Sequence, residues 1–281
     1  MLRRPASPAV GRRSGGFALL VVLWTLVLIA FIVAHLAASG RTEIRIAGNL
    51  VADAVAQAAD DGAIYASIFN QLDPNPDQRW PLNGQPRELT IGNSRVMVKL
   101  EDEAGRVNPS LASPALLEAL LRTTGSDPES ARGLAAAIGE WVGSAPTARP
   151  KNELLANYRA AGLDYGPPRE PLETIEELGR VLGMTPAVLA AIRPHLTLFG
   201  PEEPNPASAD PVVAAALAGI VQGASVPISP NQAPPDLFIV RITAAAFGPG
   251  NARVTRLAIV RVGAMLPGGY AVLTWGASTF D

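Results

Sequence analysis

The chain carries one long apolar run near its N-terminus, and this run limits what the rest of the molecule can be. From Phe17 to Ala34 the sequence reads FALLVVLWTLVLIAFIVA, with Thr25 as its only polar residue. A helix rises about 1.5 Å per residue, so roughly 20 residues cross the roughly 30 Å hydrocarbon layer of a membrane. Apolar residues continue almost without a break as far as Ala38. We therefore expect residues 17–38 to form a transmembrane helix.

The residues before the apolar run are basic. Four arginines and no acidic residue stand among the first sixteen positions. By the positive-inside rule, the N-terminus stays in the cytoplasm and the chain beyond the run lies on the far side of the membrane. The alternative is a secretory signal peptide cut near Ser39, but its apolar region would exceed the usual length of about 7 to 15 residues.

The composition is that of a folded protein with few groups for catalysis. The chain has 281 residues, of which 48% are hydrophobic, with no cysteine and a net charge of -2. A charge this close to zero argues against sequence-independent binding of nucleic acid phosphates. Only His35 and His195 could act as an imidazole base or metal ligand, and we expect His195 to be structural. We predict no catalytic site, no metal site and no cofactor.

Beyond the membrane run, the sequence predicts a continuous amphipathic helix. Apolar residues recur at spacings of mostly three and four as far as Leu72, and no proline interrupts the chain from Phe17 to that point. One helix over this range would be roughly 80 Å long, with Gly40 and Gly48 as candidate bend points. Pro74 ends it.

Five segments read as β-strands. Alternating residues flank the Gly92-Asn93 pair, which is typical of a two-residue hairpin turn. The expected strands are 87–91, 94–100, 237–246, 253–262 and 270–275.

Three adjacent carboxylates, Glu101, Asp102 and Glu103, follow the first two expected strands. Three acids in a row suggest a metal site, but adjacent strand residues point to opposite faces. We therefore expect these charges to face water.

The middle of the chain is helical. Four capping side chains stand directly before a proline, which is typical of an N-cap followed by the first helical residue, namely Ser113, Asp127, Thr185 and Asp210. Thr174 and Glu177 form a capping-box pattern, and Gly125, Gly162 and Gly183 are the expected helix stops. The expected helices are 114–123, 128–142, 151–161, 174–182, 186–193 and 211–221. A helical block between expected strands indicates an inserted domain.

The junction Gly15-Gly16-Phe17 resembles the processing site of type IV pilins and pseudopilins. In that family a membrane peptidase cuts after the glycine and methylates the new N-terminal residue. The resemblance implies a leader of residues 1–16, cleavage between Gly16 and Phe17 by a prepilin peptidase, and N-methylation of Phe17.

The fifth residue after this junction is Val21, where most members of the family carry glutamate. A carboxylate in the bilayer is costly, and in the family it pairs with the amino terminus of a neighbouring subunit. Its absence is a trait of the minor pseudopilin K family of type II secretion, whose members sit at the pseudopilus tip with no neighbour above them. The alternative is that Val21 is one more lipid-facing residue.

Four further segments resemble the same family: Asp102–Asn108, a "DE-x-G-x-x-N" pattern, and residues 152–168, 172–199 and 205–217. The implied fold class is α+β, a pilin-like long N-terminal helix plus a small antiparallel sheet, with an inserted all-helical domain. The implied division is leader 1–16, membrane helix 17–38, pilin-like helix and first hairpin 39–109, inserted helical domain 110–223 and C-terminal strands 224–281.

The implied function is mechanical. The resemblance predicts a single-pass protein of the bacterial inner membrane that caps the pseudopilus tip, supports protein export and binds other minor pseudopilins, without enzymatic activity and without nucleic acid. Three alternatives stay open: a type IV minor pilin, a secreted hydrolase with a cleaved signal, and a membrane-anchored DNA-binding module. The last rests on Leu182–Thr185, which resembles a helix-hairpin-helix turn that binds phosphates through backbone N–H groups.

Members of the family can also hold calcium through acidic residues after a tryptophan and at a following glutamate. Here Trp141 is followed by Val-Gly-Ser-Ala-Pro, and Glu153 stands close to a lysine. Calcium requires about six to eight oxygen ligands. We therefore predict no calcium site, with Glu140 and Glu153 as solvated helix residues.

Overall fold

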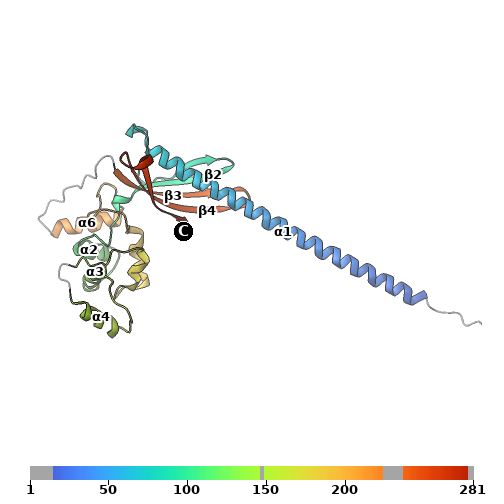
Figure 1. Cartoon of the computed structure of the whole chain (residues 1–281), viewed down its shortest axis with the longest axis horizontal. Helices are drawn as coiled ribbons and strands as arrows, with labels where there is room; N and C mark the ends of the chain where they lie inside the picture. The colour runs from blue at the N-terminus through green and yellow to red at the C-terminus, as the bar shows by residue number, and fades with distance from the viewer. Residues whose placement is uncertain (1–14, 146–148, 224–236, 278–281) are drawn as a thin grey trace, which may run out of the picture.

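The computed structural model describes residues 15–145, 149–223 and 237–277. A single helix, α1 (Gly15–Gln71), projects from a head that consists of a sheet and a group of shorter helices. The helix has 57 residues and runs without a sharp kink (Figure 1). The expectation of one continuous helix is confirmed. Of the expected leader, residues 1–14 lie outside the described residues.

The sheet has five antiparallel strands in the order β1-β2-β3-β4-β5. Their bounds are β1 Arg87–Ile91, β2 Ser94–Asp102, β3 Leu237–Phe247, β4 Arg253–Gly263 and β5 Tyr270–Ala277. Strand β2 pairs with β3 from Arg95 opposite Phe247 to Asp102 opposite Val240, although the helical segment separates them in sequence. The expected fold class, with helices inserted into a pilin-like scaffold, is confirmed.

The second half of α1 packs on one face of this sheet. Small residues of α1, including Ala56 and Ala63, are fully buried there and bring the helix close to the strands. A methyl group on Gly248, after β3, would lie 3.0 Å from the Ala56 side chain, so glycine allows this close approach. The apolar residues of α1 and the sheet form one core, whose largest members include Ile64, Ile68, Val96, Val98, Ile242 and Val260.

The helical domain has its own core. Its helices are α2 Pro114–Thr123, α3 Pro128–Val142, α4 Lys151–Ala160, α5 Pro186–Ile192 and α6 Pro211–Gly223. Their leucines, with Trp141 and Tyr158, form a cluster distinct from the one beneath α1. Burial of apolar surface at roughly 25 cal/mol per Å² stabilises each cluster separately.

The expected caps form. Ser113 Oγ accepts from Leu116 N–H at 3.2 Å, and Asp127 Oδ1 accepts from the N–H groups of Glu129 and Ser130. Gly125 and Gly162 adopt left-handed backbone conformations after α2 and α4, with φ of 105° and 82°. Local side-chain chemistry therefore sets these helix ends.

The helix expected over 174–182 is shorter than predicted. The capping box of Thr174 and Glu177 forms, but it starts only a 3-10 helix, Ile175–Arg180. Val181 is extended with ψ of 134°, and Gly183 has a positive φ of 86°. Two residues in these conformations cannot continue a helix, so the chain turns before α5 begins.

Asp60 is a buried acid on the sheet side of α1. Its side chain is fully buried, and neither carboxylate oxygen has a hydrogen-bond partner among the described residues. Burial, followed by the charge of Asp61, raises the pKa of Asp60 to about 7, although Arg256 opposes this effect. Arg256 donates instead to Asp61 Oδ1 at 2.9 Å.

We expect the stability of the protein to fall as the pH rises through the range in which Asp60 loses its proton. The folded pKa of about 7 lies above the ordinary aspartate value of 3.8, so the folded state holds an extra proton between these two pH values. The contribution of this proton to the free energy of unfolding is complete below about pH 4, and it is lost as the pH rises through about 7. Asp60→Asn should therefore be more stable than the wild type at about pH 8, by as much as about 4 kcal/mol.

Urea denaturation of the full chain in detergent, at about pH 5 and about pH 8, measures this effect. The matched control is Asp53→Asn, an exposed acid of the same helix. An equal loss of stability with pH in the wild type and Asp60→Asn proteins would show that Asp60 is not the responsible group.

Candidate functional site

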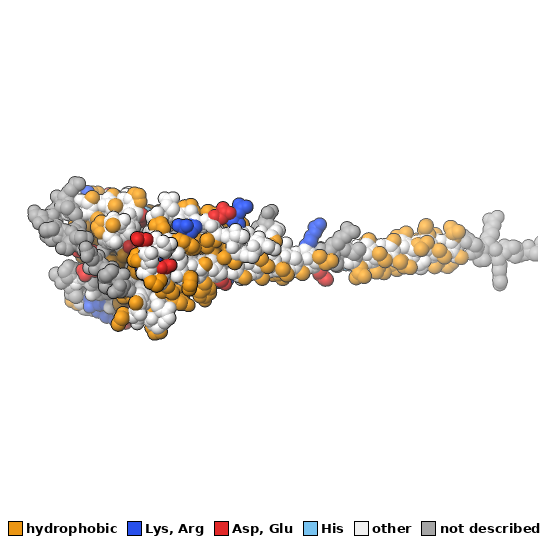
Figure 2. Space-filling view, turned by 90° about the horizontal axis from the view of Figure 1, so that it is seen from above, with side chains coloured by type: hydrophobic (Ala, Val, Ile, Leu, Met, Phe, Trp, Pro, Cys, Tyr) orange, Lys and Arg blue, Asp and Glu red, His pale blue; other side chains and the backbone are white. Residues whose placement is uncertain are grey.

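The first functional surface is the apolar part of α1. Within the described residues, one helical stretch is long and apolar enough to cross a membrane, Phe17–Leu36, with a mean hydropathy of 3.0 and no part buried. Figure 2 shows it as a rod of hydrophobic side chains that stands free of the head. Thr25 donates its hydroxyl to Val22 O at 2.8 Å, so its side chain is satisfied within the helix. This stretch is compatible with a single-pass membrane anchor.

A second apolar surface lies on α1 beyond that stretch. At 100° per residue, Ile44, Val51 and Phe69 fall on the side of α1 opposite its buried side, and we call these three residues the helix stripe. Tyr65 is half exposed, but its ring packs against Trp275 of β5 at 5.2 Å between centroids, so it is not part of the stripe. Val51 is 64% exposed and Phe69 is 79% exposed. The sequence placed all of these apolar residues on one amphipathic helix. In the structure, some of them, such as Ile68, lie in the head core, and the others form this exposed stripe. Large exposed apolar residues in a row indicate a protein contact surface.

The third feature is the connection between sheet and helical domain, which we call the joint (residues 102–108). Glu103 has no exposed surface, so the expectation that all three adjacent acids face water is wrong for this residue. Arg241 of β3 donates hydrogen bonds from Nε and Nη2 to the Glu103 carboxylate, at 2.7 and 2.6 Å. Thr197 donates a third from Oγ1 at 2.5 Å. A buried carboxylate needs such partners because desolvation is costly.

Other residues of the joint also have structural tasks. Asp102 Oδ1 accepts from Ala104 N–H at 3.0 Å, and Asn108 Nδ2 donates to Leu198 O and Gly200 O. The backbone at Gly105 passes so close to Ser208 that a side chain would not fit. The sequence pattern in this segment thus corresponds to the contacts that attach the helical domain.

Of the two acids considered for calcium, Glu153 is solvated as expected and Glu140 is not. Glu140 is not solvated, because its side chain is only 11% exposed and accepts from Arg149 Nε at 2.6 Å. Glu153 is exposed on α4. Among the described residues, no group of three or more acids and histidines could hold a metal ion.

His195 lies beside a helix N-cap. Its Nδ1 is 2.7 Å from Asp210 Oδ2, while Asp210 Oδ1 accepts from the first N–H groups of α6. Burial raises the pKa of Asp210, but the hydrogen bonds from His195 and from the α6 backbone outweigh burial and lower it overall. The geometry gives His195 a structural partner and no aligned nucleophile.

The turn at Leu182–Thr185 connects the 3-10 helix to α5. The neighbouring Arg193 forms an ion pair with Glu176, so this cation is already neutralised within the protein. A phosphate-binding hairpin requires free positive charge near the turn. Arg180 is exposed beside the turn, but Glu173 and Glu176 lie exposed just before it, so the segment forms no basic surface.

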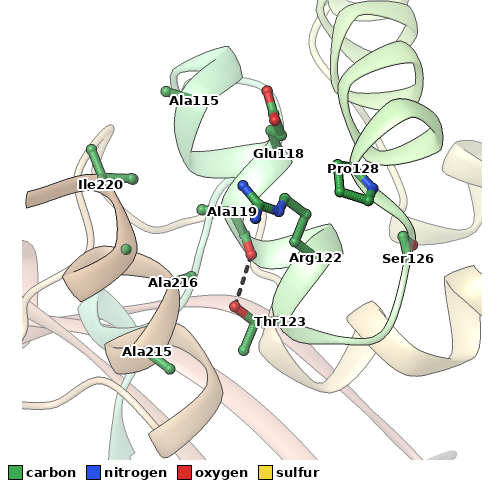
Figure 3. Close-up of a pocket in the computed structure, with 11 residues that line it drawn as sticks. Ala115, Glu118, Ala119, Arg122, Thr123, Ser126, Pro128, Ala215, Ala216 and Ile220 are labelled. Carbon is green, nitrogen blue, oxygen red and sulfur yellow. Dashed lines mark hydrogen bonds between the residues drawn. The ribbon is translucent and has the colours of Figure 1, made fainter. Parts of the chain in front are cut away.

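A groove of about 850 Å³ lies between α2, the start of α3 and α6 (Figure 3). Alanines of α2 and α6 form much of its wall, with Glu118 and Arg122 at the α2 side. Thr123 donates its hydroxyl to Ala119 O at 2.8 Å, and Glu118 lies 3.7 Å from Arg132. Among the residues that line the groove, the structure shows no hydroxyl hydrogen-bonded to a carboxylate.

The long helix packed on an antiparallel sheet, with helices inserted between β2 and β3, matches the pilin-like fold class that the sequence indicated. Residues 97–202 match the family model described as type II secretion system (T2SS), protein K. The matched residues run from β2 to the segment before α6, and the match confirms the resemblance seen in the sequence.

Five chains of solved structures match the fold. One belongs to the crystal structure of the GspK-GspI-GspJ complex from the enterotoxigenic Escherichia coli type 2 secretion system. The TM-score is 0.51 with 18% sequence identity, and the match covers 85% of this chain and 99% of that chain. At this identity the match supports the fold. No curated protein matches the sequence.

Proposed function

We propose that this protein caps the tip of a type II secretion pseudopilus and thereby supports protein export across the outer membrane. The observation that carries the proposal is the position of the helical domain, at the end of the molecule opposite the N-terminus of α1 (Figure 1). A subunit that carries a wide domain at this end leaves little room for another subunit to stack above it. In this proposal the protein is structural and catalyses no reaction.

The membrane helix supports the same position. Val21 stands among exposed apolar residues where a filament subunit would need a carboxylate for the neighbour above it. The proposed orientation places the N-terminus in the cytoplasm, α1 across the inner membrane and the helical domain in the periplasm.

The helix stripe supplies the proposed surface for partners. The related E. coli protein forms a complex with GspI and GspJ. We propose that this chain binds the corresponding minor pseudopilins, with the helix stripe packed against their long helices. Prepilin peptidase acts on the chain before assembly.

Gold-labelled antibodies against the helical domain test the tip position on isolated pseudopili. The expected result is label at one end of each filament. Label spread along the filament length would contradict the proposal, because it would show that other subunits stack above this one. Antibodies against the major subunit serve as the control for access along the filament.

We expect the native protein to begin with N-methylated Phe17. Glycine before the cut lets a peptidase draw an extended backbone into its cleft, which a bulky side chain would obstruct. Gly16→Leu should therefore leave the leader attached, while Gly15→Ala keeps a small residue next to the junction and serves as the control. Mass spectrometry of the intact protein distinguishes a start at Met1, at Phe17 and near Ser39, and either of the other two starts would contradict the prediction.

Phe69→Glu should weaken the binding of partner pseudopilins by about thirtyfold or more, since loss of an aromatic anchor costs about 2 kcal/mol. Its side chain lies outside the head core, so the fold should persist. Co-purification from detergent extracts measures the effect. Glu88→Lys, a change at an exposed residue of β1, is the matched control. Undiminished co-purification of Phe69→Glu would exclude this part of the stripe from the interface.

A further inference from the structure

The head contains two cores that share little apolar packing. One lies between α1 and the sheet, and the other lies within the helical domain. Among the described residues, the 3-10 helix Glu103–Gly105 of the joint is the part of this connection that packs on β3. The relative placement of the two parts therefore depends on a small set of contacts.

Glu103 is the point where groups from both parts meet. Its carboxylate receives Arg241 from the sheet through two parallel hydrogen bonds, and it receives Thr197 from the helical domain. Such a bidentate pair fixes the relative orientation of the two groups as well as their distance, because both hydrogen bonds form only when the guanidinium and the carboxylate face each other. Apolar packing has no comparable directional requirement.

Neighbouring contacts strengthen this arrangement. Arg106 donates to Glu101 Oε2 at 2.8 Å on the sheet side and to Pro194 O on the helical side. Val107 forms an isolated bridge with Leu196. Beside these contacts, a cleft of about 400 Å³ separates residues of the sheet end from Ser208 and its neighbours. The cleft leaves space for movement if the contacts are broken.

We propose that Glu103 is a positioning residue that fixes the orientation of the helical domain on the sheet. Without its charge, the helical domain changes its angle relative to the sheet while both cores stay folded. This inference concerns the head alone and does not depend on where the subunit sits in a filament.

Pulsed electron paramagnetic resonance on the full chain in detergent tests the proposal. The chain has no cysteine, so Ala136→Cys in α3 and Thr274→Cys in β5, both at exposed positions, give two unique labelling sites. Glu103→Gln should broaden or shift the distance distribution between the labels, with an unchanged circular dichroism spectrum. Arg241→Lys, which keeps the charge but loses the bidentate pair, should act in the same direction.

Trypsin cleavage after Arg106 gives a second readout. The joint protects this bond, and we expect cleavage in Glu103→Gln to be about a hundredfold faster, the factor that corresponds to about 3 kcal/mol lost from a buried ion pair. Glu88→Gln, which breaks an exposed pair with Arg95, is the matched control and should change neither readout.

Wild-type distance distributions in both Glu103→Gln and Arg241→Lys would overturn the proposal. If Glu103→Gln does not fold, Thr197→Val decides the question, because it removes only the contact from the helical domain. A distribution as narrow as that of the wild type in this variant would likewise overturn the proposal, and a broadened one would support it.

Discussion

Gly105→Ala should be among the most damaging single substitutions in this protein. A methyl group on Gly105 would lie 2.2 Å from the carbonyl oxygen of Ser208 and 2.9 Å from the backbone nitrogen of Ala209. Both atoms belong to the backbone, so no side-chain rotation can relieve the overlap. Overpacking of this kind costs about 1 to 3 kcal/mol and sometimes more. We expect the helical domain to be displaced from the sheet or the chain to lose stability by at least this amount.

Gly133→Ala is the matched control for this prediction. It makes the same chemical change in the middle of α3, where a methyl group meets no atom within 4 Å apart from its own helix backbone. Alanine favours helix over glycine by about 0.5 to 1 kcal/mol, so this variant should be slightly more stable than the wild type. Urea denaturation of both variants in detergent measures the difference, and equal stabilities would show that the backbone at Gly105 adapts.

The sequence predicted the helix ends well because local groups determine them. The side chains of Ser113 and Asp127 cap the helices that directly follow, and Gly125 turns the chain where α2 ends. The continuous helix α1 was equally predictable, because apolar residues recur at helical spacing and no proline interrupts the chain from Phe17 to Leu72. The 3-10 helix was not predicted correctly, because its cap is local but its early end depends on how Val181 packs in the helical core.

The joint could not be predicted, because its partners are remote in sequence. Glu103 meets Thr197 at a separation of 94 residues and Arg241 at 138 residues. From the sequence alone, three adjacent acids resemble a solvated turn. The one available signal was Arg241 itself, the only charged residue of a largely apolar strand. Such a residue needs a buried partner, and the acidic end of β2 was the nearest candidate once β2 and β3 are paired.

Two core substitutions should separate the stability of the two parts of the head. Leu120 is 1% exposed within the helical domain, and Ile64 is fully buried between α1 and the sheet. Truncation of either residue to alanine should cost about 2 to 5 kcal/mol, from lost burial and the cavity left behind. We expect Leu120→Ala to destabilise the helical domain and Ile64→Ala to destabilise the helix and sheet, each with little effect on the other part.

Hydrogen exchange measured by mass spectrometry distinguishes the two parts. Amides of α2 and α3 should exchange faster in Leu120→Ala, while those of β3 and β4 keep the wild-type rate, and the reverse should hold for Ile64→Ala. The sheet can survive unfolding of the insertion because the entropic cost of a closed loop rises by only about 0.6 kcal/mol for each doubling of its length. Equal acceleration in both parts for both variants would instead mean that the joint couples them into one cooperative unit, and Glu103 would then be the first residue to test as the source of that coupling.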